Sequence, residues 1–225
     1  MKEFFLKTSS SKAYSVIYTF LRLNVFFLFK IIFRLKAFGR ENIPIEGRLV
    51  LCSNHLSYID PVMMGLCIKR PIFYMAKIQL FTNKFVTAVV RWFNAYPVNR
   101  GAFDRQAIRN SVAILNAEQI IGLYPEGRRS TDGVIREGHQ GVGLISIMAN
   151  SQVLPVAITG SNMIIQKPHK RLFFPQIRIA FGKPIDTASI VKKYGSRQAS
   201  EIITLQTMAE IKELYQKINS GKDRK

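Results

Sequence analysis

Acidic residues and cysteines are scarce in this sequence. Its 225 residues include 14 Asp and Glu against 33 Lys and Arg, which gives a formal net charge of +19 and a pI of about 10.2. Such an imbalance favours polyanionic partners, namely nucleic acid, an anionic membrane or an acidic carrier protein. Cys52 and Cys67 are the only cysteines, and their spacing fits neither a metal site nor a disulfide framework. We therefore predict a reducing compartment, no metal and no cofactor.

The sequence also lacks a long uninterrupted hydrophobic run. Residues 13–37 are dense in apolar side chains, but Arg22, Lys30 and Arg34 interrupt them well short of the about 20 apolar residues that a membrane-spanning helix needs. Each central Lys or Arg costs about 2.5–3.5 kcal/mol on insertion scales. No small-residue cleavage site follows, so a cleaved signal peptide is not expected.

On a helical wheel, this N-terminal segment separates into a basic face and an apolar face, although Leu23, Phe26 and Phe33 break the basic one. The pattern predicts helices in the membrane interface, with the basic face toward anionic headgroups. The alternative is an amphipathic helix that packs on the protein core. We predict a membrane-interface segment over residues 1–37 and a peripheral, monotopic protein on the cytoplasmic face of the membrane.

A candidate catalytic pair stands directly after an apolar run, where His55 precedes Asp60 by five positions. Histidine is the commonest general base, and a carboxylate can fix its tautomer and stabilise the imidazolium. On one straight helix the two would point about 140° apart, so the chain must bend between them. Pro61, typical of a first helical turn, suggests that the bend ends at Asp60. The alternative is a helix-capping Asp60 beside an incidental histidine.

A second motif, Pro-Glu-Gly-Arg-Arg, follows another apolar run at residues 125–129. Arginine matches phosphate oxygens with two parallel hydrogen bonds, and a glycine turn lets backbone donors approach an anion. A solvated basic turn is the alternative. The sequence has no Gly-x-Ser-x-Gly nucleophile elbow. Together these features suggest direct attack by the hydroxyl of a phosphate-bearing substrate, with a histidine as base.

Four blocks in this order resemble the glycerolipid acyltransferases, specifically the 1-acylglycerol-3-phosphate acyltransferase (lysophosphatidic acid acyltransferase) family. They are the His-x4-Asp block at residues 54–60 and the blocks at 92–100, 124–130 and 153–158, and the resemblance covers residues 38–182. It implies that His55 is the base and Asp60 its orienting partner. The acceptor-binding positions that it implies are Asn54, Arg100, Glu126, Gly127 and Arg129, with the two arginines on the phosphate.

Two positions depart from the family pattern. Arg128 stands where the family usually has Thr, and Asn99 where it often has Asp. Neither falls on the predicted base, but either could change the phosphate site or the preferred acceptor.

Apolar runs that alternate with helical patterns predict an α/β layered domain over residues 38–220, with a largely parallel sheet flanked by helices and a disordered tail at 221–225. In such folds ligands bind beyond the carboxyl ends of the strands. The expected strands are 48–52, 72–76, 119–124, 153–158 and 177–181, and the expected helices are 61–68, 80–93, 104–117, 141–149 and 199–218.

The sequence thus predicts an enzyme of phospholipid biosynthesis. By resemblance, it transfers a fatty acyl group from acyl-CoA or acyl-carrier protein to the 2-hydroxyl of lysophosphatidic acid at an anionic membrane surface, which forms phosphatidic acid. One alternative is another acceptor, such as glycerol 3-phosphate or an amino-acid lysolipid. The other is a basic nucleic-acid-binding protein, but zinc-finger spacing and aromatic-basic RNA motifs are absent, so we expect no nucleic-acid partner.

Overall fold

The computed structural model describes residues 23–99, 104–130, 132–166 and 171–220. Their centre is a seven-stranded sheet, and all neighbouring strands in it run parallel except for the antiparallel β6–β9 pair. Its strands, in spatial order, are β1 (Lys36–Phe38), β9 (Arg178–Phe181), β6 (Gln152–Thr159), β2 (Leu49–Ser53), β5 (Ile120–Leu123), β3 (Ile72–Lys77) and β4 (Ala95–Val98). A small hairpin joins β7 (Ile165–Gln166) to β8 (Arg171–Leu172). The predicted α/β class with a largely parallel sheet is confirmed.

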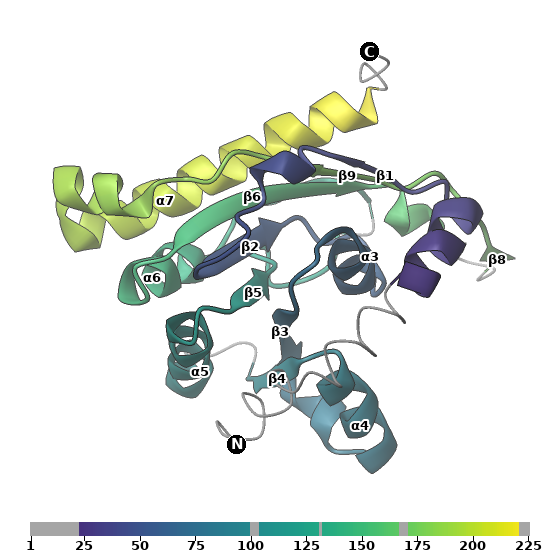
Figure 1. Ribbon diagram of the computed structural model, residues 1–225, viewed down its shortest axis with the longest axis horizontal. Helices are drawn as coiled ribbons and strands as arrows, with labels where there is room; N and C mark the ends of the chain where they lie inside the picture. Colours follow the sequence, from purple (N-terminus) through teal and green to yellow (C-terminus); the bar gives the residue numbers. More distant parts are fainter. Residues whose placement is uncertain (1–22, 100–103, 131, 167–170, 221–225) are drawn as a thin grey trace.

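Helices cover both faces of this sheet (Figure 1). One face packs against α3 (Asp60–Cys67), and the other packs against α5 (Arg105–Asn116), α6 (Gly141–Met148) and α7 (Thr187–Asn219). The helix α4 (Lys84–Trp92) follows the short 3-10 helix η2 (Ile78–Phe81) and lies beside the edge strand β4. Two further 3-10 turns are η1 (Arg40–Asn42) and η3 (Ser161–Met163).

The central strand β2 shows why the apolar runs are continuous rather than alternating. Leu49 and Leu51 belong to the cluster on the α3 face, whereas Val50 and Cys52 belong to the cluster on the opposite face. A parallel strand that is covered on both faces needs apolar side chains at every position. Burial, and secondarily the charge of Glu126, raises the pKa of the Cys52 thiol, which makes this thiol unreactive.

Two strands of the large sheet and part of one helix were not predicted. β4 contains Pro97, and proline disfavours a strand assignment except at an edge, which is where β4 lies. β1 has only three residues, which is too short for a recognisable pattern. The C-terminal helix was expected to begin at residue 199, but it begins at Thr187, and Gly195 interrupts it with a φ of 73°.

The described part of the N-terminal segment is helical over residues 23–32 and has two apolar faces. Phe26 packs against the core, and Phe33 just after the helix is buried in it, so two of the residues that break the predicted basic face contact protein. Leu28 and Ile31, from the predicted apolar face, are exposed. The core-packing alternative is therefore right for one face. At the end of the predicted interfacial segment, Leu35 is buried and Lys36 begins β1, so these residues belong to the domain. Residues 1–22 of that segment, and the tail at 221–225, lie outside the described residues.

Within the described residues, no helix combines the length and the apolar composition needed to cross a membrane.

Candidate active site

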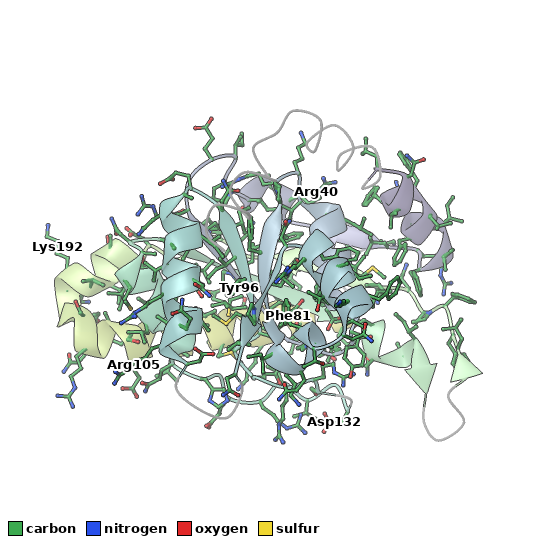
Figure 2. All side chains as sticks on the ribbon, turned by 90° about the horizontal axis from the view of Figure 1, so that it is seen from below. Arg40, Phe81, Tyr96, Arg105, Asp132 and Lys192 are labelled. Carbon is green, nitrogen blue, oxygen red and sulfur yellow. The ribbon has the colours of Figure 1, made fainter. Side chains whose placement is uncertain are left out.

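Two loops follow the carboxyl ends of parallel strands and lie on the same side of the sheet. They are the histidine loop (residues 54–59) and the arginine loop (residues 124–130). β2 and β5 are parallel neighbours with Cys52 opposite Leu123, so His55 and Glu126 each stand three residues beyond this matched pair. Figure 2 shows Asp132, in the loop that continues from residues 124–130, at the lower edge of the molecule. Arg40, which follows the oppositely directed β1, lies near the upper edge. The carboxyl ends of the parallel strands therefore gather both motifs.

The predicted contact between His55 and Asp60 is present. His55 Nδ1 lies 2.9 Å from Asp60 Oδ2, and the side chain of Asp60 has no solvent exposure. The same carboxylate oxygen accepts hydrogen bonds from the N–H groups of Leu56 and Ser57, each at 2.7 Å. Asp60 therefore makes the bend that brings it to the histidine, because its carboxylate holds the backbone of the loop that precedes it.

The helix-capping alternative for Asp60 is wrong. Helix α3 begins at Asp60 itself, after Ile59, and no side chain caps its first turn. A capping carboxylate would accept from N–H groups within that turn, whereas Asp60 accepts from the loop before it. Its second oxygen, Oδ1, accepts from the Ser161 hydroxyl at 2.6 Å.

These contacts determine which ring nitrogen of His55 carries the hydrogen. An ionised carboxylate only accepts hydrogen bonds, and the other three partners of Asp60 are all donors. His55 Nδ1 therefore carries a hydrogen and donates it, which leaves the lone pair of Nε2 available to accept a proton. This is the tautomer that a general base needs.

Tyr124 fixes the plane of the imidazole. The ring centroids of His55 and Tyr124 are 4.0 Å apart, and their planes are inclined by only 22°. Burial, followed by the nearby Tyr74 and Asp60, raises the pKa of the Tyr124 hydroxyl well above its usual value, so the ring that stacks on His55 is a neutral phenol. Among the described residues this hydroxyl has no hydrogen-bond partner. Sequence reasoning gave Tyr124 no role, although it stands inside the matched block.

Glu126 joins three segments of backbone. Its Oε1 accepts from the N–H of His55 at 3.2 Å, and its Oε2 accepts from the N–H of Arg136 at 3.0 Å. The N–H of Ser130 in turn donates to the carbonyl of His55 at 2.7 Å. Glu126 was expected at an acceptor-binding position, but it is buried and both oxygens hold backbone groups. We therefore assign it to holding the histidine loop.

In the arginine loop, Gly127 and Arg128 are exposed and Arg129 is half-buried. Gly127 has a φ of 66°, and a Cβ there would come within 3.2 Å of the His139 ring, so both its conformation and its surroundings favour glycine. The Arg129 guanidinium lies 3.5 Å from the centroid of the Tyr58 ring, which belongs to the histidine loop. This contact holds Arg129 against the histidine loop. Arg100 lies outside the described residues.

Asn54, expected at a substrate-binding position, makes its side-chain hydrogen bonds to β6. Its Nδ2 donates to the carbonyl of Ile158 at 2.9 Å, and its Oδ1 accepts from the N–H of Ile158 at 2.8 Å. The side chain is fully buried. This paired contact ties the start of the histidine loop to β6, so Asn54 is a structural residue.

We expect Asn54→Ala to destabilise the fold by about 2–4 kcal/mol, because two hydrogen bonds vanish and two buried backbone groups lose their partners. Urea unfolding measures this loss. A variant with the stability of the natural protein and a raised KM for its acceptor would instead restore the substrate-binding role.

A cavity of about 1380 Å³ opens beside the arginine loop, on the face of the sheet that carries α5 and α6. Its polar lining includes Glu126, Arg128 and His139. Its apolar lining comes from strands and helices, and includes Met75, Val98, Ile108, Leu123, Val142, Leu144 and Ile145. The cavity is thus lined by both polar and apolar side chains.

Comparisons with known proteins agree with this geometry. Residues 34–159 match the family model described as Acyltransferase. The chain is similar to the 1-acyl-sn-glycerol-3-phosphate acyltransferase of Bacillus subtilis (strain 168), at 26% identity over 82% of this chain and 89% of that protein. It is also similar to the protein of the same name from Streptococcus pneumoniae (strain ATCC BAA-255 / R6), at 30% identity over 78% of this chain and 65% of that protein.

A solved structure shares the fold. The crystal structure of the 1-acyl-sn-glycerophosphate (LPA) acyltransferase, PlsC, from Thermotoga maritima matches with a TM-score of 0.63 and 21% sequence identity. The match covers 89% of this chain and 88% of that one.

Proposed function

Because this chain belongs to the acyltransferase family, we propose that it transfers a fatty acyl group to the 2-hydroxyl of 1-acylglycerol-3-phosphate, which forms phosphatidic acid. The observation that carries the proposal is the buried His55–Asp60 pair, which stands beside the arginine loop at one edge of the sheet. The names of the similar proteins support this acceptor. The proposed donor is an acyl thioester of coenzyme A or of an acyl-carrier protein.

The proposed reaction is a direct acyl transfer. His55 Nε2 removes the proton of the 2-hydroxyl while that oxygen attacks the thioester carbonyl carbon. A new ester C–O bond forms, the C–S bond breaks, and the leaving thiolate takes the proton back from the imidazolium. Asp60 stays ionised and stabilises the imidazolium between these two steps.

Positioning of the acceptor supplies part of the rate. Arg129 is proposed to bind the acceptor phosphate with Arg100, and its contact with Tyr58 holds it against the histidine loop. A phosphate anchored there would place the hydroxyl of the same molecule within hydrogen-bond reach of His55, which makes the reaction effectively unimolecular. The cavity beside Arg128, which has many apolar lining residues, is proposed to take a fatty acyl chain.

We expect Arg129→Ala to lower kcat/KM for 1-acylglycerol-3-phosphate by about 10- to 100-fold, since a charge-assisted hydrogen bond contributes about 1.5–3 kcal/mol. The loss should be smaller for 1-acylglycerol, which has no phosphate. Arg128→Thr is the matched control, because it removes a neighbouring charge and restores the usual family residue. Equal losses of Arg129→Ala on both acceptors would show that Arg129 is structural.

An assay with a panel of acceptors tests the proposed function. The purified protein is incubated with acyl-CoA or acyl-carrier protein and with 1-acylglycerol-3-phosphate, glycerol 3-phosphate, an amino-acid lysolipid or 1-acylglycerol. Phosphatidic acid from the first acceptor, at the highest kcat/KM of the panel, is the expected result. A higher kcat/KM for another acceptor would assign the same site to that acceptor and would give Arg128 a role in selecting it.

A further inference from the structure

The segment from η2 to the end of α4 carries an exposed apolar surface at the side of the sheet. Its most exposed member is Phe85, at 78%, and the others are 41–46% exposed. We call this set the α4 surface, and it consists of Ile78, Leu80, Phe85, Val89 and Phe93. Single exposed apolar residues are ordinary, but a cluster on one short segment marks an interaction site.

Helix α4 has one wide apolar arc whose two sides differ in exposure. At 100° per residue, Val86 and Val90 fall on one side, and both are half-buried against the protein. Phe85 and Val89 lie about 100° away around the helix, and both are exposed. A helix that only covered the edge of the sheet would be polar on its outer face. The exposed side of this apolar arc is therefore a candidate contact surface.

Charge indicates what this surface meets. Lys77, Lys84 and Arg91 are all exposed in the same segment, and the sequence from Lys77 to Phe93 has no acidic residue. On the helical wheel, Lys84 and Arg91 lie together about 130° from Phe85 and Val89, on the polar side of the helix. An exposed apolar side combined with a basic side is the pattern of a helix that lies in a membrane interface.

The α4 surface begins at the same edge of the sheet as the active site. β3 is parallel to β5 with Tyr74 opposite Gly122, so Lys77 at the end of β3 is level with Pro125. Ile78 and Leu80 therefore leave the sheet beside the loop that carries Glu126 and Arg129. Helix α4 then returns along the sheet, on the side away from α7 (Figure 1).

We propose that the α4 surface is a second membrane-contact surface, which binds the interface of an anionic lipid bilayer independently of residues 1–37. This inference rests on the proposed function in one respect, since a lysophospholipid acceptor would then enter from the lipid at the edge where His55 lies. The contact itself needs only the apolar and basic side chains of the segment.

The single tryptophan of the sequence, Trp92, is the last residue of α4, so its fluorescence reports on this helix. The full chain is mixed with vesicles of phosphatidylglycerol and phosphatidylethanolamine, with or without bromine atoms on the lipid acyl chains. We expect a blue shift of the emission and strong quenching by the brominated lipids, because bromine quenches only at short range. Unquenched emission from protein that sediments with the vesicles would overturn the proposal.

Two matched variants test the α4 surface while residues 1–37 stay unchanged. Phe85→Ser should weaken vesicle binding about tenfold, which corresponds to roughly 1.4 kcal/mol. Leu205→Ser removes a comparably exposed apolar residue from α7 and should leave binding unchanged. Equal binding by both variants, or an emission shift that grows with protein concentration without vesicles, would contradict a lipid contact, and the latter would indicate a second copy of the chain.

A separate assay distinguishes a failure of the membrane-contact proposal from a failure of the proposed function. Acylation of a short-chain, water-soluble 1-acylglycerol-3-phosphate without vesicles tests the chemistry alone, and Phe85→Ser should leave it unchanged. Quenching without acylation would refute the proposed function but support membrane contact by the α4 surface. Acylation without quenching would support the proposed function but refute the membrane contact.

Discussion

His55→Ala is expected to lower turnover by about two to four powers of ten, because the variant loses the group that removes the hydroxyl proton. The fold should persist. Both backbone contacts of residue 55, with Glu126 and Ser130, involve main-chain atoms that alanine also has. Asp60 would still accept hydrogen bonds from Leu56, Ser57 and Ser161.

Turnover and the melting temperature of the His55→Ala variant have to be measured together. A folded variant with the turnover of the natural protein would refute His55 as the base. An unfolded variant would instead show that the stack with Tyr124 contributes more to stability than these contacts suggest.

Asp60→Asn is expected to cost about a hundredfold in turnover, which is severe but less than the loss in His55→Ala. An asparagine Oδ1 can accept the three hydrogen bonds now made to Oδ2, so His55 keeps its tautomer. The amide then faces Ser161, whose hydroxyl can turn and accept instead of donate. What the variant loses is the negative charge that stabilises the imidazolium.

Ser161→Ala is the control for the claim that the Ser161 hydroxyl accepts from the amide in Asp60→Asn. Alone it should change turnover by less than about tenfold, because Asp60 keeps three other donors. Combined with Asp60→Asn it should destabilise the protein more than the sum of the single changes, since the buried amide loses its acceptor. Strictly additive effects on the free energy of unfolding would show that Ser161 does not accept from residue 60.

The parts of the fold that could be predicted are those with a strong local pattern. The buried strands β2, β5 and β6 are continuous apolar runs, and Asp104 marks the start of α5, where its side chain caps the helix. β4 was missed because Pro97 is tolerated only by its edge position, which depends on the order of the strands. The first turns of α7 were missed because Gly195 hides their continuity with the rest.

The residues of the site also divide into those that the sequence predicts and those that it does not. His55 and Asp60 stand close together in the sequence and have distinctive chemistry, so their contact could be predicted. Ser161 was missed because a serine a hundred residues downstream of Asp60 carries no chemical signal of its own. Asn54 and Glu126 were assigned to substrate because their motifs suggest it, whereas their partners are backbone atoms that only the folded sheet brings near.

The outer face of α4 shows a third kind of limit. Its Phe and Val residues are evident in the sequence, and a helix over 80–93 was expected. Which of them would be exposed depends on how α4 sits beside β4, and the sequence pattern does not contain that information.

The most direct measurement is a product analysis with two acceptors that differ only at the attacking oxygen. Purified protein is incubated with an acyl thioester and either 1-acylglycerol-3-phosphate or its 2-O-methyl ether, and the lipids are identified by mass spectrometry. We expect phosphatidic acid from the first acceptor and no acylation of the ether, which should inhibit competitively because its phosphate still binds. Folded protein that forms no phosphatidic acid with either thioester donor would contradict the proposed function.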